Sequence, residues 1–297
     1  MNKKTRSVLC ILLAGILWGC MGLFVRPLND RGLTTWDIVF LRAIGTTLLL
    51  GLFLLLTNRK AFRIKAKDLW CFLGTGLLSI VFFNFCYFKE ITLTSLSVAA
   101  ILLYTAPAFV ILISAPCFGE KITVKKLLAL LLTFAGLVFV TGVIGDAGLL
   151  SGRAILIGLG AGLGYALYSI FGRYALERGY SSLTISFYTF LFASIGSVFF
   201  TNPVRIYRTV TTSWQELGLV AVFVLVSTVI PYITYTLGLK RVENGQASII
   251  ASIEPVVATL IGVFLFRETL TAGNLIGIVL VLGAIILCNT EKRTQPQ

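Results

Sequence analysis

The chain has 297 residues, of which 57% are hydrophobic and 12% are charged, and its formal net charge is +13. A mean hydropathy of +0.95 leaves too little polar surface to cover a soluble fold. The composition therefore excludes a soluble enzyme or binding domain. It indicates a polytopic membrane protein with the lipid bilayer as its partner.

Long apolar runs predict ten membrane-spanning helices, because a bilayer core requires about 20 apolar residues per helix. In chain order, the predicted helices cover residues 7–27, 34–57, 68–89, 94–117, 123–143, 152–175, 181–201, 214–238, 244–266 and 272–290. The connections are short and contain caps and breakers such as Pro27 and Thr34. The predicted fold class is all-α integral membrane, with no room for a soluble domain.

Lysine and arginine are unevenly divided between the two sides that ten spans define. Seventeen of the 25 lie on the side of the N-terminus, seven lie on the other side, and Arg42 lies within a span. Basic connections stay in the cytoplasm, so we expect both termini to be cytoplasmic and the protein to reside in the cell membrane. The same pattern explains the net charge without a nucleic-acid partner.

Residues 243–271 form an apolar stretch that is interrupted at its centre by Glu254-Pro255. A charged side chain in hydrocarbon costs about 2.5–3.5 kcal/mol even on lenient insertion scales, so Glu254 is expected to face a partner or water. Pro255 cannot donate a backbone hydrogen bond and frees the carbonyl four residues earlier. We therefore expect a hinge at Pro255.

The same layout occurs 148 residues earlier in the chain. There Pro107 matches Pro255 and Glu120 matches Glu268. The chain is therefore a tandem repeat, and Pro107 is a second expected hinge.

Each repeat holds five predicted helices, in residues 1–145 and 146–297. Five is an odd number, so the second repeat enters the membrane in the opposite orientation. Inverted repeats are typical of secondary transporters, whose substrate site lies near the midplane where the halves meet.

Several of these features together resemble the EamA-type permeases of the drug/metabolite transporter superfamily. They are Trp18-Gly19 in the first helix, Arg42 early in the second, prolines in helices four and nine, and the endings P-x11-G-E-K-I-T and E-P-x11-R-E-T-L-T. The resemblance covers almost the whole chain and implies two five-helix repeats and solute transport. Members of this family carry amino acids, other metabolites or drugs, so the resemblance does not specify the substrate.

Aromatic and small polar residues deep within the spans are candidates for the wall of a substrate cavity, because Tyr and Trp combine an apolar body with a polar tip. Trp18 and Tyr165 occupy equivalent positions in the two repeats, as expected for a central site. Packing between helices is the alternative role for such residues. The predicted substrate-binding residues are Trp18, Asn84, Tyr87, Tyr104, Tyr165, Tyr168, Tyr235 and Ser248.

Two charged residues within the spans have alternative interpretations. Glu254 is either a group that binds a proton or a substrate amine, or a structural acceptor beside Pro255. Arg42 either binds a substrate carboxylate, or it anchors helix ends or pairs with Asp37 or Glu254. The proton is accordingly a candidate coupling ion.

Glu120 and Glu268 fall at helix ends just before the expected N-caps Thr123 and Thr271. Capping or hinge chemistry is therefore favoured over substrate contact. The predicted topology places one glutamate on each side of the membrane, as two gates related by inverted symmetry would require.

The sequence offers little support for metal or cofactor chemistry. The chain contains no histidine, and its six cysteines are scattered without a C-x-x-C motif. We therefore expect no cofactor and no metal site, and we disfavour an integral membrane enzyme that acts on lipids. A non-transporting scaffold is also disfavoured, since no soluble interaction domain is present.

The leading hypothesis is a secondary transporter that moves small organic metabolites out of the cell by alternating access, with amino acids as the first candidate substrates. The alternative is broad-specificity efflux of lipophilic amines or drugs, with Glu254 as the partner of the cation. A phosphorylated substrate would require several basic residues in the cavity, and Arg42 is the single candidate.

Overall fold

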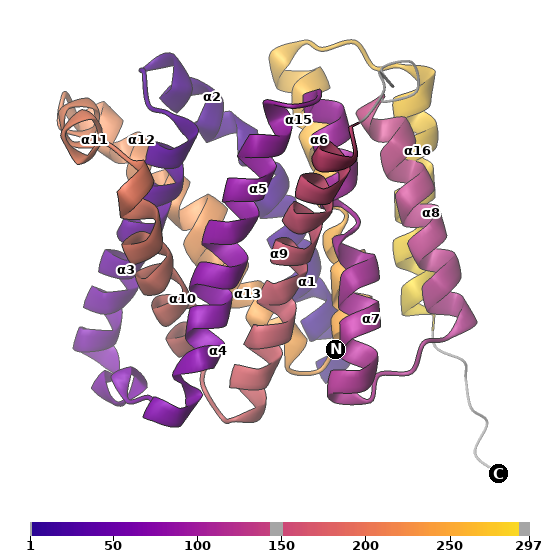
Figure 1. Cartoon of the computed structure of the whole chain (residues 1–297), viewed down its shortest axis with the longest axis horizontal. Coiled ribbons are helices and arrows are strands. Elements are labelled where there is room, and N and C mark those ends of the chain that lie inside the picture. The colour runs from indigo at the N-terminus through magenta and orange to yellow at the C-terminus, as the bar shows by residue number, and fades with distance from the viewer. Residues whose placement is uncertain (1, 143–150, 291–297) are drawn as a thin grey trace.

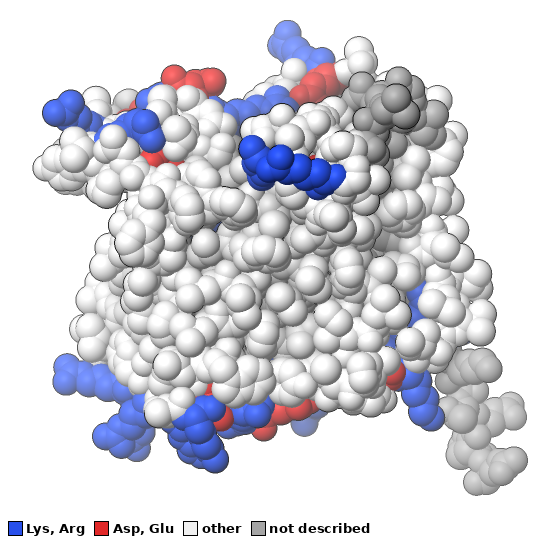
Figure 2. Space-filling model, in the orientation of Figure 1, with Lys and Arg blue, Asp and Glu red and all other residues white. Residues whose placement is uncertain are grey.

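The structure, a computed structural model, describes residues 2–142 and 151–290. Within these ranges there are ten helices long and apolar enough to cross a membrane, and no strand. The helices run between two faces (Figure 1), and Figure 2 shows charged side chains gathered at these faces with an uncharged band between them. The predicted all-α membrane fold with ten spans is confirmed.

Several spans consist of more than one helical segment. In chain order, the ten spans are α1 (Lys3–Gly19) with α2 (Gly22–Asp30); α3 (Thr35–Thr57); α4 (Leu69–Leu73), a π-helical segment (Gly74–Val81) and α5 (Phe82–Ile91); α6 (Leu96–Leu103) with α7 (Ala106–Phe118); α8 (Val124–Thr141); α9 (Gly152–Glu177); α10 (Ser182–Ser197); α12 (Trp214–Val224), a second π-helical segment (Leu225–Val229) and α13 (Ile230–Leu239); α14 (Asn244–Ala251) with α15 (Glu254–Phe266); and α16 (Ala272–Asn289). Short 3-10 segments (Arg59–Phe62, Ala66–Asp68 and Val198–Phe200) and α11 (Pro203–Val210) lie in or beside the connections.

We call the face with the start of α1 and the end of α16 the terminal face, and the other the opposite face. Met1 and Gln297 lie outside the described residues, as does the predicted repeat boundary between residues 145 and 146. The connection between α7 and α8 lies on the terminal face, and the connection between α5 and α6 lies on the opposite face.

The internal repeat is visible in the helix boundaries themselves. The helices α5, α6, α7 and α8 each begin and end 148 residues before α13, α14, α15 and α16. Because α6 begins on the opposite face and α14 begins on the terminal face, the repeats are inverted. The final helices α8 and α16 pack side by side (Figure 1), and a Cβ atom added at Gly277 would lie 2.5 Å from the carbonyl oxygen of Gly136.

The first span differs from the continuous helix predicted over residues 7–27. It is interrupted at Cys20-Met21, whereas the matching helix α9 is continuous. Glycines border the interruption at positions 19 and 22, and glycine is among the poorest residues in a helix interior. Pro27 lies inside α2 rather than at the helix end.

The short helix α11 on the opposite face was not predicted. Asn202 caps it by accepting a hydrogen bond from the backbone N–H of Arg205. Asp37, at the start of α3, accepts from the backbone N–H of Asn202 at 3.0 Å and pairs with Arg205 at 2.6 Å. These contacts fasten α11 to the first repeat.

Candidate functional site

Two spans are broken at matching positions in the middle of the bundle. Residues 104 and 105 separate α6 from α7, and residues 252 and 253 separate α14 from α15. Pro107 and Pro255 each lie in the first turn of the second segment, where a helix needs no proline N–H. Glu254 is the first residue of α15, so its carboxylate lies at the positive end of a half-helix.

The helix α1 passes very close to the break between α14 and α15. A Cβ atom added at Gly15 would lie 3.0 Å from the carbonyl oxygen of Ala251. At Gly19 it would lie 2.6 Å from the carbonyl oxygen of Glu254. Glycine at both positions therefore allows the first repeat to pack directly on the broken backbone of the second.

A cavity of about 810 Å³ lies between the repeats and reaches the opposite face. At its inner end it is lined from the middle of the spans by Trp18, Arg42, Tyr104, Tyr165, Tyr232 and Glu254. At its outer end it is lined by Asn29, Thr35, Ile91, Thr92, Leu96 and Ser97. These outer residues are helix ends of the opposite face, so the cavity connects the centre of the bundle with that face.

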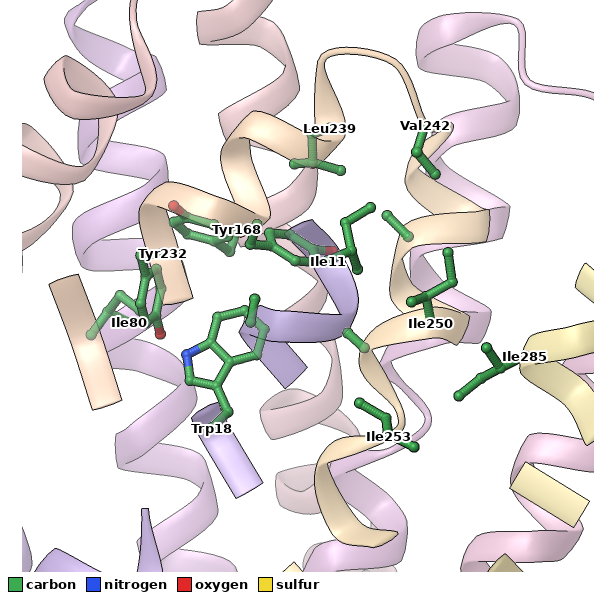
Figure 3. Close-up of a cluster of buried hydrophobic side chains, with 14 of the residues drawn as sticks. Ile11, Trp18, Ile80, Tyr168, Tyr232, Leu239, Val242, Ile250, Ile253 and Ile285 are labelled. Atoms are coloured by element: carbon green, nitrogen blue, oxygen red, sulfur yellow. The ribbon is translucent and has the colours of Figure 1, made fainter. Parts of the chain in front are cut away.

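On the other side of this cavity, packed side chains fill the terminal half of the bundle. Ile11, Leu239 and Ile250 are fully buried there. Figure 3 shows this cluster, with Leu239 and Val242 at one end and Trp18 at the other. The pathway through the protein is therefore closed towards the terminal face.

A second, small space of about 20 Å³ lies within this cluster, beside the large cavity, and it has room for about one water molecule. Tyr168 and Tyr235 line it rather than the large cavity. Their hydroxyls are engaged in hydrogen bonds, Tyr168 with Thr236 at 2.9 Å and Tyr235 with Ser169 at 2.8 Å. These two tyrosines help to close the terminal side in this state.

The remaining residues predicted for the substrate site fall into two groups. Five line the large cavity, namely Trp18, Asn84, Tyr87, Tyr104 and Tyr165. Ser248 lines neither space, because α14 packs against α1 and α7 and the Ser248 hydroxyl donates to the carbonyl of Gly245 at 2.9 Å. The expected cavity position of Ser248 is corrected to a packed position near the terminal face.

Trp18 lies at the centre of an aromatic group. Its ring centroid is 5.2 Å from that of Tyr232, 5.3 Å from that of Tyr235 and 6.4 Å from that of Tyr165. The indole Nε1 of Trp18 is buried and has no hydrogen-bond partner in the described part of the chain. A buried donor without a partner favours a ligand that can accept its hydrogen bond.

The carboxylate of Glu254 accepts a hydrogen bond from the hydroxyl of Tyr165, over 3.1 Å between Oε2 and the phenolic oxygen. No ion pair joins Glu254 to a basic residue among residues 2–142 and 151–290. Glu254 is thus free of a direct basic partner among the described residues at the inner end of the cavity.

Arg42 is 5% exposed and donates to the hydroxyl of Tyr232 at 3.3 Å and to the sulfur of Met21 at 3.5 Å. Its Nε has no partner in the part of the chain that the structure describes. The expected pair with Asp37 is wrong, because Asp37 sits in the first turn of α3 at the opposite face and binds Arg205. The expected pair with Glu254 is also not formed.

The cavity therefore presents a basic and an acidic side chain that form no direct ion pair with each other, on walls that are largely aromatic and aliphatic. Such a site can hold a small molecule with a carboxylate and an ammonium group. Among the described residues, no group of three His, Cys, Asp or Glu side chains is arranged to hold a metal ion.

Sequence reasoning missed Met21, Ser97 and Thr259, which also line the cavity. No signal in the sequence distinguished them, since methionine, serine and threonine are ordinary within helices. Tyr232 carried the same aromatic signal as its neighbours and touches both spaces.

Comparison with known proteins agrees with this architecture. The model of the EamA-like transporter family matches residues 5–142 and again residues 152–290. An uncharacterized transporter of Archaeoglobus fulgidus is 32% identical over 290 residues, which cover 95% of each chain. The threonine/homoserine exporter RhtA of Salmonella typhimurium is 26% identical over 259 residues, which cover 86% of this chain and 81% of RhtA. A solved crystal structure superposes on 96% of the chain with a TM-score of 0.78 at 18% identity, a likeness of fold alone.

Proposed function

Because the chain belongs to the EamA-like transporter family, we propose that it exports amino acids, or similar small zwitterionic metabolites, through the central cavity by alternating access. The two inverted repeats and the cavity between them support this mechanism.

The observation that carries the proposal is the presence of Arg42 and Glu254 on the same cavity without a bond between them. A charge that leaves bulk water for a largely apolar site is costly unless it is paired. A zwitterion satisfies both charges at once, because its carboxylate binds the guanidinium and its ammonium binds the carboxylate. A substrate with one charge would leave the other residue unsatisfied.

The aromatic surface between the two charges supports a small organic substrate. Trp18 stands between Tyr232, which binds Arg42, and Tyr165, which binds Glu254. Its Nε1 is a second donor for the substrate carboxylate. The similarity to a threonine/homoserine exporter over most of the chain is consistent with this class of substrate.

We place the terminal face in the cytoplasm and the protein in the cell membrane, because the connections of that face carry most of the basic residues. In this orientation the cavity opens to the outside, so the structure corresponds to the state that releases an exported substrate. A proton that enters from outside would compete with the substrate ammonium for Glu254. We propose the proton as the coupling ion on that basis.

The second candidate is efflux of lipophilic amines, which the aromatic walls and Glu254 favour. The two functions differ in their need for Arg42, because an amine without a carboxylate gains nothing from a guanidinium.

Counterflow in proteoliposomes tests the proposal with three related compounds: threonine, threonine methyl ester and N-acetylthreonine. We expect uptake of threonine and little uptake of either derivative, because each derivative lacks one of the two charges. Equal uptake of the ester would support amine efflux instead. Uptake of none above protein-free liposomes would reject small amino acids of this size as substrates.

A further inference from the structure

Glu120 and Glu268 occupy equivalent positions in the two repeats but have different partners. Each glutamate follows a residue in the left-handed conformation that ends a helix, Gly119 at φ 65° and Arg267 at φ 57°. The local backbone is therefore alike at the two sites. The difference between them lies in what each carboxylate binds.

At the terminal face, Glu120 ties the first repeat to the second. Its Oε1 accepts from the backbone N–H of Asn244 at 2.6 Å, and its Oε2 accepts from that of Gly245 at 3.1 Å. These are the first two residues of α14, so the carboxylate caps that helix. Lys126 lies 3.6 Å from Glu120 and 2.6 Å from Glu243, which adds positive charge to this buried contact.

At the opposite face, the corresponding contact is absent from the described residues. The equivalents of Asn244 and Gly245 are Leu96 and Ser97, the first two residues of α6. Their backbone N–H groups donate to no protein group in the described ranges, and both residues line the cavity. Glu268 instead pairs with Arg26 at 2.7 Å, with half of its side chain exposed.

The arginines follow the same asymmetry. Arg173 donates to the carbonyls of Leu239 and Val242, at the end of α13 beside the Glu120 contact. Its equivalent in the first repeat, Arg26, makes no such contact with the end of α5 in the described residues and lies over the ring of Phe266, 4.0 Å from its centroid. The terminal face thus has the glutamate cap and the arginine contact together, whereas in the described residues α6 has neither and is capped by its own Ser95, which accepts from the backbone N–H of Val98 at 3.3 Å.

We propose that Glu120 and Glu268 are the two latches of alternating access, and that each closes its own face by capping the half-helix of the other repeat. In the state seen here Glu120 is latched and Glu268 is held by Arg26. In the inward-open state Glu268 caps α6 at Leu96 and Ser97, while Glu120 leaves α14. The proposal rests on alternating access but is independent of the substrate.

The physical basis is a competition between two equivalent helix ends. The first N–H groups of a helix have no partner within the helix, and a carboxylate is a favourable acceptor for them because it also interacts with the helix dipole. In the state described here one half-helix, α14, has a glutamate cap from the other repeat, and the proposed cap changes sides when the accessible face changes. The carboxylates thereby favour either closed face over a state open on both sides.

Hydrogen–deuterium exchange of the detergent-purified full chain tests the latch without any substrate. The peptides to compare are 92–103, which contains the start of α6, and 240–251, which contains the start of α14. Glu120→Gln should exchange about tenfold faster at the start of α14, because a charged acceptor becomes a neutral one. It should also exchange more slowly at the start of α6, since the population shifts to the inward-open state.

Glu268→Gln should have the reverse effect, with stronger protection at the start of α14 and no gain at α6. Its side chain is half-exposed, so this variant is expected to fold normally. Glu216→Gln is the control, because Glu216 pairs with Arg31 at the opposite face, away from both helix starts.

The reciprocal change separates a latch from a cap that only stabilises its own helix. If Glu120→Gln speeds exchange in 240–251 and leaves 92–103 at the wild-type rate, the proposal is overturned. It is likewise overturned if Glu268→Gln matches wild type in both peptides. Neither outcome depends on threonine being transported, so failure of the latch and failure of the proposed substrate are distinguishable.

Discussion

Arg42 of the first repeat donates a hydrogen bond to the hydroxyl of Tyr232 in the second repeat, over 3.3 Å between the guanidinium Nη2 and the phenolic oxygen. This bond crosses the boundary between the repeats at the inner end of the cavity. It holds the guanidinium in place while its Nε stays without a partner in the described residues. The cation is thus oriented without being neutralised.

We predict that Arg42→Gln weakens substrate binding far more than it weakens folding. Loss of a charge-assisted hydrogen bond costs about 1.5–3 kcal/mol, which corresponds to roughly a 10- to 150-fold rise in KM for threonine. Removal of an unpaired buried charge should leave Tm unchanged or raised. Transport kinetics and thermal unfolding of the same preparation measure both.

Arg205→Gln is the matched control for Arg42, because it breaks an ion pair outside the cavity. We expect it to lower Tm, since Asp37 is left buried and unpaired, and to leave KM near the wild-type value. An Arg42→Gln variant with normal KM would remove Arg42 from substrate recognition.

The prediction for Glu254 separates its two interpretations. Glu254→Gln keeps the acceptor for Tyr165 but removes the negative charge. If the carboxylate binds a proton or a substrate amine, flux in proteoliposomes should collapse while Tm is retained. Glu254→Ala should lower Tm as well, because the Tyr165 hydroxyl loses its partner. Near-normal flux in the Gln variant would leave Glu254 a structural acceptor.

Gly19→Ala is predicted to destabilise the protein by about 1–3 kcal/mol, the usual cost of overpacking. The added methyl group would lie 2.6 Å from the Glu254 carbonyl oxygen, so α1 must move away from the break before α15. Gly22→Ala is the control, since an added Cβ meets no atom within 4 Å there. Denaturant unfolding should show a loss of stability of at least about 1 kcal/mol for Gly19→Ala and a smaller change for Gly22→Ala. Equal stabilities of the two variants would contradict the close packing.

The topology prediction concerns the basic connection between α3 and α4. Lys65→Cys should react with a membrane-impermeant thiol reagent in inside-out vesicles and stay unlabelled in intact cells. Wild type provides the background from the six native cysteines. Labelling in intact cells would place the terminal face outside and reverse the proposed direction of opening.

Much of the fold could be predicted because its signals are local. Thr34, Thr123 and Thr271 cap the helices that they were expected to begin. The repeat was readable because matching residues keep one spacing through the second half of each repeat. The break in the first span and the helix α11 were missed, because short interruptions and eight-residue helices leave weak patterns.

The site was predictable only where residue type alone decides the environment. A carboxylate inside an apolar span must face a cavity or a partner, and Glu254 does. Ser248 and Tyr168 could not be placed in this way, because helical periodicity does not tell which neighbour covers a given face. The partner of Arg42 depended on Tyr232, which is 190 residues away in the chain.

In the proposed transport cycle, the packed side chains between Trp18 and the terminal face also determine where the membrane voltage acts. In the proposed orientation, water in a cavity that reaches the opposite face would carry the outside potential inwards, so the voltage would fall mainly across the packed terminal half. In the proposed switch of the accessible face, the same voltage would fall across the other half, so Arg42 and Glu254 would cross it electrically while hardly moving. A zwitterion crosses without net charge, whereas each exchanged proton gains about 2.3 kcal/mol per 100 mV. Membrane potential should therefore drive export only through the proton, and collapse of the potential at constant pH should slow threonine export.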